Sequence, residues 1–270
     1  MPGHCGSWDW NEPPAARARS GRGPGKRAVT APSRRILLAP GYILHHRPYR
    51  DTSRILEVLV RDHGRLTLFA RGVRGPKPRF GGVLQPFEPL LLSFQVGREA
   101  GQLTGAESAQ NSPALPAGSL MAGFYLNELL LKLTVRHDPM AEVFEDYRLA
   151  LEGLRAGARV EAVLRLFEKR LLEAVGYGVD LTSEAGTGRA IEAGRFYRFR
   201  VSEGLVPARG DEADALAGES LLALAREELQ EGRALEDSRR VLQAALAQRL
   251  EGELTTRRVA RALAGAKTRR

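Results

Sequence analysis

The sequence predicts an α+β protein of two folded domains, in which a small closed β-barrel comes first and an all-α helical domain follows. Between residues 34 and 107, apolar and polar residues alternate at strand spacing, and turn-forming residues separate five short runs. From residue 119 onward, apolar residues recur at helical spacing instead. We therefore expect three segments: a disordered basic extension at 1–33, the barrel at 34–107 and the helical domain at 108–270.

The five expected strands lie at 36–44, 52–61, 65–72, 90–96 and 102–107, and Pro40-Gly41 should interrupt the first. Asp62-His63-Gly64 is typical of a hairpin turn, because glycine readily adopts a positive φ. In the third run, Leu66, Leu68 and Ala70 share one face of the strand. The opposite face should carry Arg65, Thr67, Phe69 and Arg71. Five short strands with turns between them favour a closed barrel.

The helical half should contain helices at 119–134, 138–154, 160–175, 219–230 and 238–250, with a last short one starting near residue 255. Ser119 is a candidate N-cap, and Asp138-Pro139 combines an N-cap residue with proline at the first helical position. Residues 183–207 read as a mixed, loop-like segment with an aromatic patch of Phe196, Tyr197 and Phe199.

Composition limits the classes of protein that this chain can belong to. Of its 270 residues, 43% are hydrophobic, which is enough for a sizeable core. No apolar run approaches the length of a membrane span, and the N-terminus lacks the apolar region of a secretory signal. The single cysteine, Cys5, predicts neither an internal disulfide nor a cysteine-based zinc site. These features fit a reducing cytoplasm.

The net charge of +9 is concentrated in the first third of the chain. Residues 34–105 contain twelve basic and five acidic residues, whereas residues 106–270 are nearly balanced, with 24 basic and 25 acidic. A local surplus of this kind indicates a binding site for an anionic partner, most commonly nucleic acid. Residues 1–33 carry a smaller surplus. We interpret them as a non-essential extension or an upstream start codon in preference to an accessory nucleic-acid arm.

The basic residues of the barrel are interleaved with aromatic ones. Strand-binding proteins need cations along a groove for phosphates and aromatic rings on which bases stack. The candidate nucleic-acid residues are Arg47, Tyr49, Arg50, Arg65, Phe69, Arg71, Arg74, Lys77 and Arg79. The last three lie in a Gly/Pro-rich loop at 72–82, which we expect to be flexible. The alternative is a solvated charged face, with Tyr49 and Phe69 in the core.

Catalysis has little support in the sequence. There is no P-loop, no GxSxG motif and no dinucleotide fingerprint. The glycines of GYGVD (176–180) are better explained as the end of a helix. The histidines form no metal-binding pattern with cysteine, so we predict no metal and no cofactor, and we do not expect an enzyme.

The expected helix at 160–175 has basic residues beside its apolar face. Leu164, Phe167, Leu171 and Val175 share one face, and a core role is the default interpretation. Arg165, Lys169 and Arg170 border it. An apolar groove edged by such cations would accept an acidic peptide that ends in a hydrophobic residue.

Taken in order, several motifs resemble the RecO family of bacterial DNA repair proteins. They are RPYRDTS (47–53), HGRLTLFARGVR (63–74), LQPFEPLLLSF (84–94), FYLNELLLKL (124–133), LRLFEKRLLEAVGYGVDL (164–181) and GLVPA (204–208). Each motif alone is weakly specific, but the ordered set spans about residues 36–260.

The resemblance implies an N-terminal OB-fold joined to a helical domain. It implies a mediator of recombinational repair in the RecF pathway, active in the bacterial cytoplasm in association with the nucleoid. Such a mediator binds single- and double-stranded DNA, anneals complementary strands, binds RecR and helps to load RecA. It also contacts the C-terminal tail of single-stranded DNA-binding protein, and Arg165 matches a position implicated in that contact.

The chain departs from the family in three places. Some members have a four-cysteine zinc site after the GYGVDL segment, and this chain has no cysteine there. The C-terminal LTTRRVARAL differs from the usual LKSRELFR, and the extension before residue 34 is unusual. Two other functions stay open: an RNA-binding module, since an OB-fold does not by itself select the sugar, and a protein-interaction scaffold without DNA activity.

Overall fold

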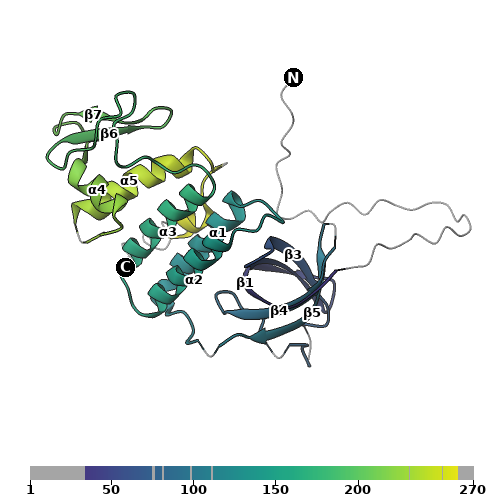
Figure 1. Cartoon of the computed structure of the whole chain (residues 1–270). Helices are drawn as coiled ribbons and strands as arrows, with labels where there is room; N and C mark the ends of the chain where they lie inside the picture. Colours follow the sequence, from purple (N-terminus) through teal and green to yellow (C-terminus); the bar gives the residue numbers. More distant parts are fainter. Residues whose placement is uncertain are drawn as a thin grey trace, which may run out of the picture. The chain divides into compact units, whose positions relative to one another are not determined.

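The computed structural model describes residues 34–74, 77–80, 82–97, 99–110, 112–230, 232–250 and 252–260. The predicted basic extension at 1–33 lies outside these residues. The described chain begins with five strands that close into a barrel and continues mainly as helices (Figure 1). Both parts belong to one compact unit that starts at Ser33. The fold class is the predicted one, a β-barrel followed by a helical part.

The barrel strands are β1 (Arg35–Tyr49), β2 (Ser53–Val60), β3 (Gly64–Ala70), β4 (Leu90–Gln95) and β5 (Gly101–Ser108). They close in the order β1-β2-β3-β5-β4, and β4 pairs back onto β1. The contact between β3 and β5 is parallel, and all other neighbours are antiparallel. A small five-stranded barrel of this kind is OB-like, as the family resemblance implied.

The first strand is longer than predicted, because it continues through Pro40 and Gly41 over 15 residues. Its pairing register shifts twice, and such bulges bend a strand. The bend lets the first part of β1 pair with β4 and the second part with β2. Gly41 pairs with both neighbours, and a Cβ there would lie 2.7 Å from Leu92 Cδ1, so only glycine fits without a shift.

The predicted alternation in β3 is confirmed. Leu66, Leu68 and Ala70 are buried in the barrel interior, while Arg65 and Phe69 are only partly buried. The interior is filled by aliphatic side chains from all five strands, together with Phe94. Burial of these side chains is the main source of stability for the barrel.

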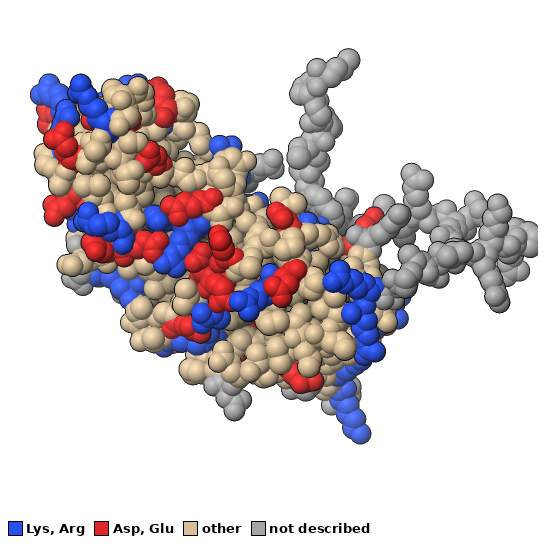
Figure 2. Space-filling model, in the orientation of Figure 1, with Lys and Arg blue, Asp and Glu red and all other residues tan. Residues whose placement is uncertain are grey.

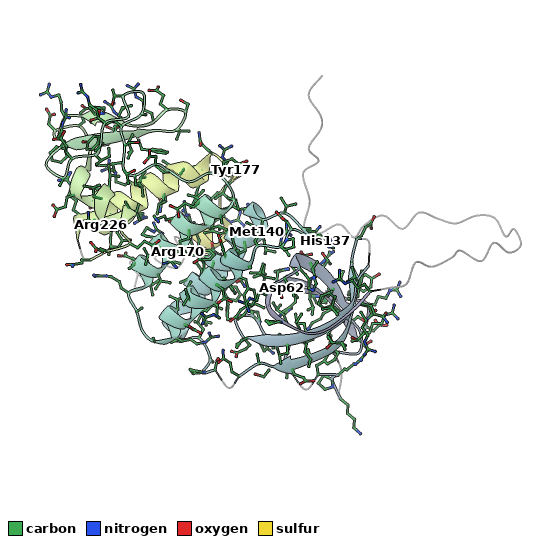
Figure 3. The ribbon with its side chains drawn as sticks, in the orientation of Figure 1. Asp62, His137, Met140, Arg170, Tyr177 and Arg226 are labelled. Carbon is green, nitrogen blue, oxygen red and sulfur yellow. The ribbon has the colours of Figure 1, made fainter. Side chains whose placement is uncertain are left out.

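The β2–β3 turn also attaches the barrel to the helical part. Gly64 has φ +67°, and a Cβ there would lie 1.9 Å from the Asp138 carbonyl oxygen. The His137 amide donates a hydrogen bond to the Arg65 carbonyl over 3.0 Å. Figure 3 labels Asp62 in this turn and His137 in the facing segment. This contact explains why the second helix begins later than Asp138-Pro139 predicted, at Ala141.

The helices are η1 (Ala117–Ser119), α1 (Leu120–Leu133), α2 (Ala141–Arg155), α3 (Val160–Ala174), α4 (Gly218–Ala225) and α5 (Arg233–Ala247). Residues 255–260 are also helical, as predicted. Ser119 precedes α1 but makes no side-chain capping bond.

The segment predicted as a loop contains strands instead. These are β6 (Phe196–Arg200), β7 (Gly204–Ala208) and β8 (Leu216–Ala217), in the order β7-β6-β8. Tyr197 from the predicted aromatic patch is fully buried, and its hydroxyl accepts a hydrogen bond from the Glu192 amide over 2.9 Å. The helical part therefore includes a small sheet that its short strands did not reveal in the sequence.

One part of the outer barrel surface is covered by helices. Tyr42, Leu44 and Leu59 belong to the same hydrophobic core as α1, α2 and α3. Asn127 Nδ2 donates to the Leu44 carbonyl over 2.8 Å, and the Tyr147 hydroxyl donates to Asn127 Oδ1 over 2.5 Å. These buried polar contacts fix α1 and α2 against β1, so binding surfaces on the barrel must lie elsewhere.

The described residues contain neither a helix that could span a membrane nor a cluster of side chains that could hold a metal ion. No helix among them is long and apolar enough to cross a membrane. Within the same part of the chain, no three or more His, Cys, Asp or Glu side chains are grouped so as to hold a metal ion.

Candidate nucleic-acid interface

An aromatic platform lies on the uncovered outer face of the barrel. Strand pairing aligns one row of positions across four strands: Arg47, Ile55, Phe69 and Gln102. Paired positions on neighbouring strands place their side chains on the same face. The Tyr49 ring lies beside this row, with its centroid 5.4 Å from that of Phe69. Both rings are half-buried, so part of each is available to a stacked base.

Arg50 adds a cation to this platform. It follows β1 in the turn to β2, where its φ of 52° makes it one of the few non-glycine residues with left-handed backbone. Its guanidinium carbon lies 5.3 Å from the centroid of the Tyr49 ring, within the range of a cation–π contact. The side chain is exposed, and a phosphate next to a base stacked on Tyr49 would be within its reach.

The segment after β3 brings further cations to the same side of the barrel. Arg71, Arg74, Lys77 and Arg79 are all exposed. The Arg74 amide donates to the Thr52 carbonyl over 3.0 Å, and the Arg74 side chain donates to the Arg50 carbonyl over 3.3 Å. These bonds hold the described part of the loop against the β1–β2 turn, so Arg74 lies next to Arg50.

Arg79 is anchored to another strand. Its Nη2 donates to the Thr104 carbonyl on β5 over 2.9 Å, and its guanidinium lies over the Phe80 ring at 4.8 Å. The guanidinium has five N–H donors, and the bond to Thr104 uses one of them. Because the side chain is exposed, donors remain available to a phosphate. Arg79 is thus positioned before any ligand binds.

Sequence reasoning missed Arg54, which completes a basic pocket at one end of the barrel. This pocket has a volume of about 340 Å³, and its basic lining residues are Arg54, Arg74 and Arg79. Arg54 lies in β2 in phase with the interior residues Leu56 and Val58. Alternation therefore predicts that Arg54 is a core residue. Because Arg54 lies at the end of its strand, its side chain lines the pocket at the mouth of the barrel instead.

The structure places Arg65 apart from the other candidate residues. Only 12% of its side chain is exposed, and its Nη1 forms an ion pair with Glu57 Oε2 at 3.3 Å. Its other nitrogens donate to Thr134 Oγ1 and to the Thr134 carbonyl. Burial lowers the pKa of the Arg65 guanidinium, and the nearby Arg136 lowers it further. Arg65 therefore joins the barrel to the end of α1, and each of its three nitrogens already donates a hydrogen bond.

Among the described residues, the cations of the interface form no ion pair with a carboxylate, whereas many cations of the helical part do. Within the described residues, no ion pair to a carboxylate is formed by Arg47, Arg50, Arg54, Arg71, Arg74, Lys77 or Arg79. By contrast, Arg148, Arg170, Arg198 and Arg233 of the helical part each pair with an acid. Figure 2 shows a band of basic side chains along the barrel and a mixture of both charges over the helices. Unpaired surface cations produce the stronger field for a polyanion.

The three basic residues predicted on α3 do not form one surface. Arg165 is 6% exposed and pairs with the fully buried Glu168 at 2.6 Å. Lys169 lies 3.1 Å from Glu227 Oε1. Arg170 pairs with Glu227 as well, and with Asp146 at 3.0 Å. Lys169 and Arg170 thus hold α3 to the end of α4, while Arg165 faces a cavity.

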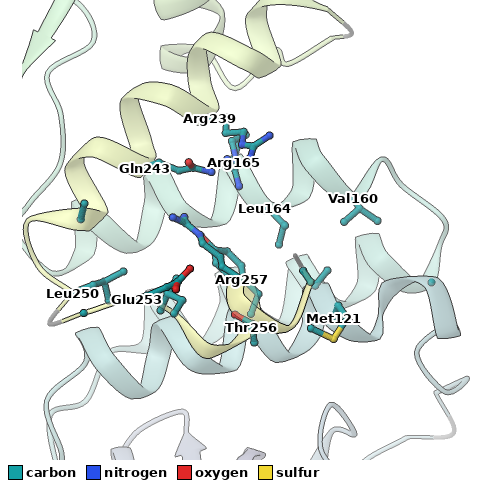
Figure 4. Close-up of a pocket in the computed structure, with 17 residues that line it drawn as sticks. Met121, Val160, Leu164, Arg165, Arg239, Gln243, Leu250, Glu253, Thr256 and Arg257 are labelled. Atoms are coloured by element: carbon teal, nitrogen blue, oxygen red, sulfur yellow. The ribbon is translucent and has the colours of Figure 1, made fainter. Parts of the chain in front are cut away.

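That cavity, which we call the α1–α3–α5 pocket, has a volume of about 900 Å³. Its apolar lining includes Met121, Val160, Leu164, Leu250 and Leu254. Two arginines that sequence reasoning missed, Arg239 of α5 and Arg257 of the 255–260 helix, join Arg165 around it (Figure 4). They come from segments far from α3 in the sequence, so no local pattern linked them.

One carboxylate lies beneath this basic pocket. Glu168 accepts hydrogen bonds from the Tyr125 hydroxyl over 2.5 Å and from Arg165. Burial raises the pKa of the Glu168 carboxyl group, and the neighbouring Arg165 guanidinium opposes that rise. Arg165, Arg239 and Arg257 all act electrostatically on Glu168, and Glu253 also lines the pocket. The three arginines outnumber these two carboxylates. A hollow with apolar walls and a surplus of positive charge suits an acidic, partly apolar ligand.

Comparison with known proteins agrees with this architecture. The family description "Recombination protein O N terminal" matches residues 35–112, and "Recombination protein O C terminal" matches residues 118–258. A protein named DNA repair protein RecO from Methylococcus capsulatus is 44% identical over 218 residues, which cover 81% of this chain and 90% of the relative. The protein of the same name from Nitrosococcus oceani is 41% identical over 215 residues, with 79% and 87% covered. One from Azoarcus is 38% identical over 235 residues, with 85% and 97% covered. The chain therefore belongs to the RecO family of DNA repair proteins.

Proposed function

We propose that this protein is a DNA-binding mediator of recombinational repair in the RecF pathway, which anneals complementary single strands without catalysing a covalent step. The observation that supports this most strongly is the group of cations around the Tyr49–Phe69 platform, which have no carboxylate partner in the described part of the chain. A surface with these properties recognises the phosphate backbone and the faces of the bases, and it needs no particular sequence.

Annealing would follow from charge neutralisation. Two complementary strands repel each other through their phosphates, and each phosphate that pairs with Lys or Arg also releases condensed counterions. Arg50, Arg71 and Arg74 would hold one strand near the aromatic platform. The pocket formed by Arg54 and Arg79 provides further cations close by, so a second strand can approach at lower electrostatic cost.

Recruitment would be the task of the helical part. The α1–α3–α5 pocket combines apolar walls with Arg165, Arg239 and Arg257. The C-terminal tail of single-stranded DNA-binding protein is the expected ligand, because an acidic peptide with a hydrophobic end complements both properties. Binding of RecR and help in loading RecA, within the bacterial cytoplasm, are proposed from family membership.

An annealing assay tests the DNA site and the recruitment site together. Complementary strands are coated with single-stranded DNA-binding protein, and duplex formation is followed with and without this protein. We expect faster annealing, and a matched RNA pair should compete less well than DNA. Preferential use of the RNA pair would favour the RNA-binding alternative. Failure to bind any oligonucleotide at about 0.1 M salt, a concentration at which phosphate contacts still contribute, would favour the scaffold alternative.

The peptide site needs a variant that leaves the fold intact. Arg165→Ala would remove the partner of the buried Glu168 and so destabilise the helical part. Arg239→Ala is more informative, because this side chain is exposed and has no ion-pair partner among the described residues. It should weaken binding of a short acidic peptide that ends in Phe but leave affinity for naked DNA unchanged. The matched control is Arg226→Ala, an exposed helical-part arginine paired with Glu228. Equal loss in both variants would contradict the assignment.

A further inference from the structure

One carboxylate of α1 accepts three hydrogen bonds from the start of the helical segment 255–260. Glu128 of α1 accepts hydrogen bonds from the Thr255 amide over 2.7 Å and from the Thr256 amide over 2.9 Å. It also accepts one from the Thr256 hydroxyl over 2.7 Å. Burial alone would raise the pKa of Glu128, but the bonds from Thr256 and Thr255 lower it below the usual value. Glu128 thus caps the first turn of this helix as an ionised group.

The next residue, Arg257, extends from this turn into the α1–α3–α5 pocket (Figure 4). Its Nη2 donates to the Tyr125 hydroxyl over 3.0 Å, and its guanidinium carbon lies 5.5 Å from the Tyr125 ring centroid. The Tyr125 hydroxyl in turn donates to Glu168, which pairs with Arg165. A continuous chain of polar contacts therefore connects Arg257 with Arg165 across the pocket.

The same segment supplies one wall of the pocket. Leu254, Thr256, Arg257 and Ala260 all line it, and Leu254 is only 2% exposed. If this segment left α1, the pocket would lose one of its three arginines and an apolar side at the same time. The pocket is thus formed jointly by α1, α3, α5 and the C-terminal helix.

We infer that Glu128 is a positioning residue for the peptide site: by capping the 255–260 helix, it places Arg257 where an acidic peptide binds. The inference rests on the proposed peptide-binding function of the pocket. Glu128 itself does not line the cavity, so its effect on a peptide must act through the capped helix. The ligand class is an acidic peptide with a large apolar residue. Arg257 supplies a positive charge for the acidic part, and Leu254 supplies apolar surface for the apolar residue.

The test measures binding of a fluorescently labelled acidic peptide that ends in Phe to the full chain. Glu128→Gln keeps the shape of the side chain but replaces one acceptor oxygen with a donor NH2 group, so either the Thr255 amide or the Thr256 amide loses its acceptor, and the negative charge is lost. We expect at least about tenfold weaker binding, equivalent to about 1.4 kcal/mol. Thr256→Val, which removes one of the three bonds, should have a smaller effect. Glu142→Gln, the same chemical change in the first turn of α2, is the control.

A double-mutant cycle separates positioning from general stabilisation. If Glu128 acts mainly by placing Arg257, then Glu128→Gln should cause a much smaller further loss when Arg257 is already alanine. Additive losses would mean that Glu128 only stabilises the fold, and the inference would be wrong. DNA affinity should be unchanged in every variant.

The outcomes also distinguish this inference from the proposed site. If Arg239→Ala and Arg257→Ala weaken peptide binding but Glu128→Gln does not, the pocket stands and the positioning role is rejected. If neither arginine variant affects the peptide, the proposed site fails and this inference fails with it.

Discussion

Replacing Arg71 and Arg74 together by alanine removes two exposed guanidinium groups that have no carboxylate partner among the described residues. Each is free to neutralise one phosphate. The dependence of log K on log salt should therefore become shallower by about 0.7 per lost contact for a single strand and about 0.9 for a duplex. For the double variant the expected change is about 1.4 with single-stranded DNA and about 1.8 with duplex DNA.

The assay is fluorescence anisotropy with an oligonucleotide, over a fourfold range of salt. Across that range, a slope difference of about 1.4 means that the affinity of the wild type falls about sevenfold further than that of the variant. This difference is large compared with ordinary measurement error. A thermal melt of each protein shows whether the variant is folded.

The matched control is the pair Arg209→Ala and Arg226→Ala. Both side chains are exposed, and they pair with Asp211 at 3.0 Å and Glu228 at 2.9 Å. This control lowers the net charge by the same two units but leaves the barrel intact. An equal slope change in the control would show that DNA senses only the net charge. An unchanged slope in the Arg71 and Arg74 variant would refute the assigned interface.

Two further predictions concern stacking and pH. Phe69→Ala should weaken single-strand binding by about 1 kcal/mol or more without changing the salt slope, because stacking releases no counterions. Tyr177→Ala, an exposed aromatic of the helical part, serves as its control, and a shallower slope for Phe69→Ala would argue against stacking. The hydrogen bonds from Arg170 lower the pKa of Glu227 to about 2 from its usual 4.5. Its contribution to stability should be complete above about pH 4.5 and disappear as pH falls toward 2, since the unfolded chain then binds the extra proton. Thermal melts against Glu227→Gln test this, and a stability difference that does not change with pH would contradict it.

Most of the barrel was predictable because strand alternation is a local property. Leu66, Leu68 and Ala70 are buried as their spacing indicated, and the adjoining Phe69 is on the outer face. The continuation of β1 through Pro40 and Gly41 was not predictable. It depends on bulges and on the close approach of Leu92, which is 51 residues away from Gly41 in the sequence and adjacent in the barrel.

The candidate interface was also predictable only in part. The charge surplus and the interleaved aromatic residues indicated the correct surface for Tyr49, Arg50 and Phe69, which the structure brings together. Arg65 has the same spacing as Phe69, but Thr134, 69 residues later, covers its side of the strand. Alternation identifies the side of a strand on which a residue lies. It does not reveal what packs against that side.

What the sequence by itself determined was the order of barrel and helices, the position of the unbalanced charge and membership of the RecO family. Only the tertiary structure decided which cations are free. In the structure, Lys169 and Arg170 pair with Glu227, and the buried Arg165 pairs with Glu168. The basic pockets contain three arginines that the sequence did not indicate, Arg54, Arg239 and Arg257. The physical reason is that periodicity reports local geometry, whereas the availability of a charge depends on partners such as Tyr125 and Arg257, which lie 132 residues apart.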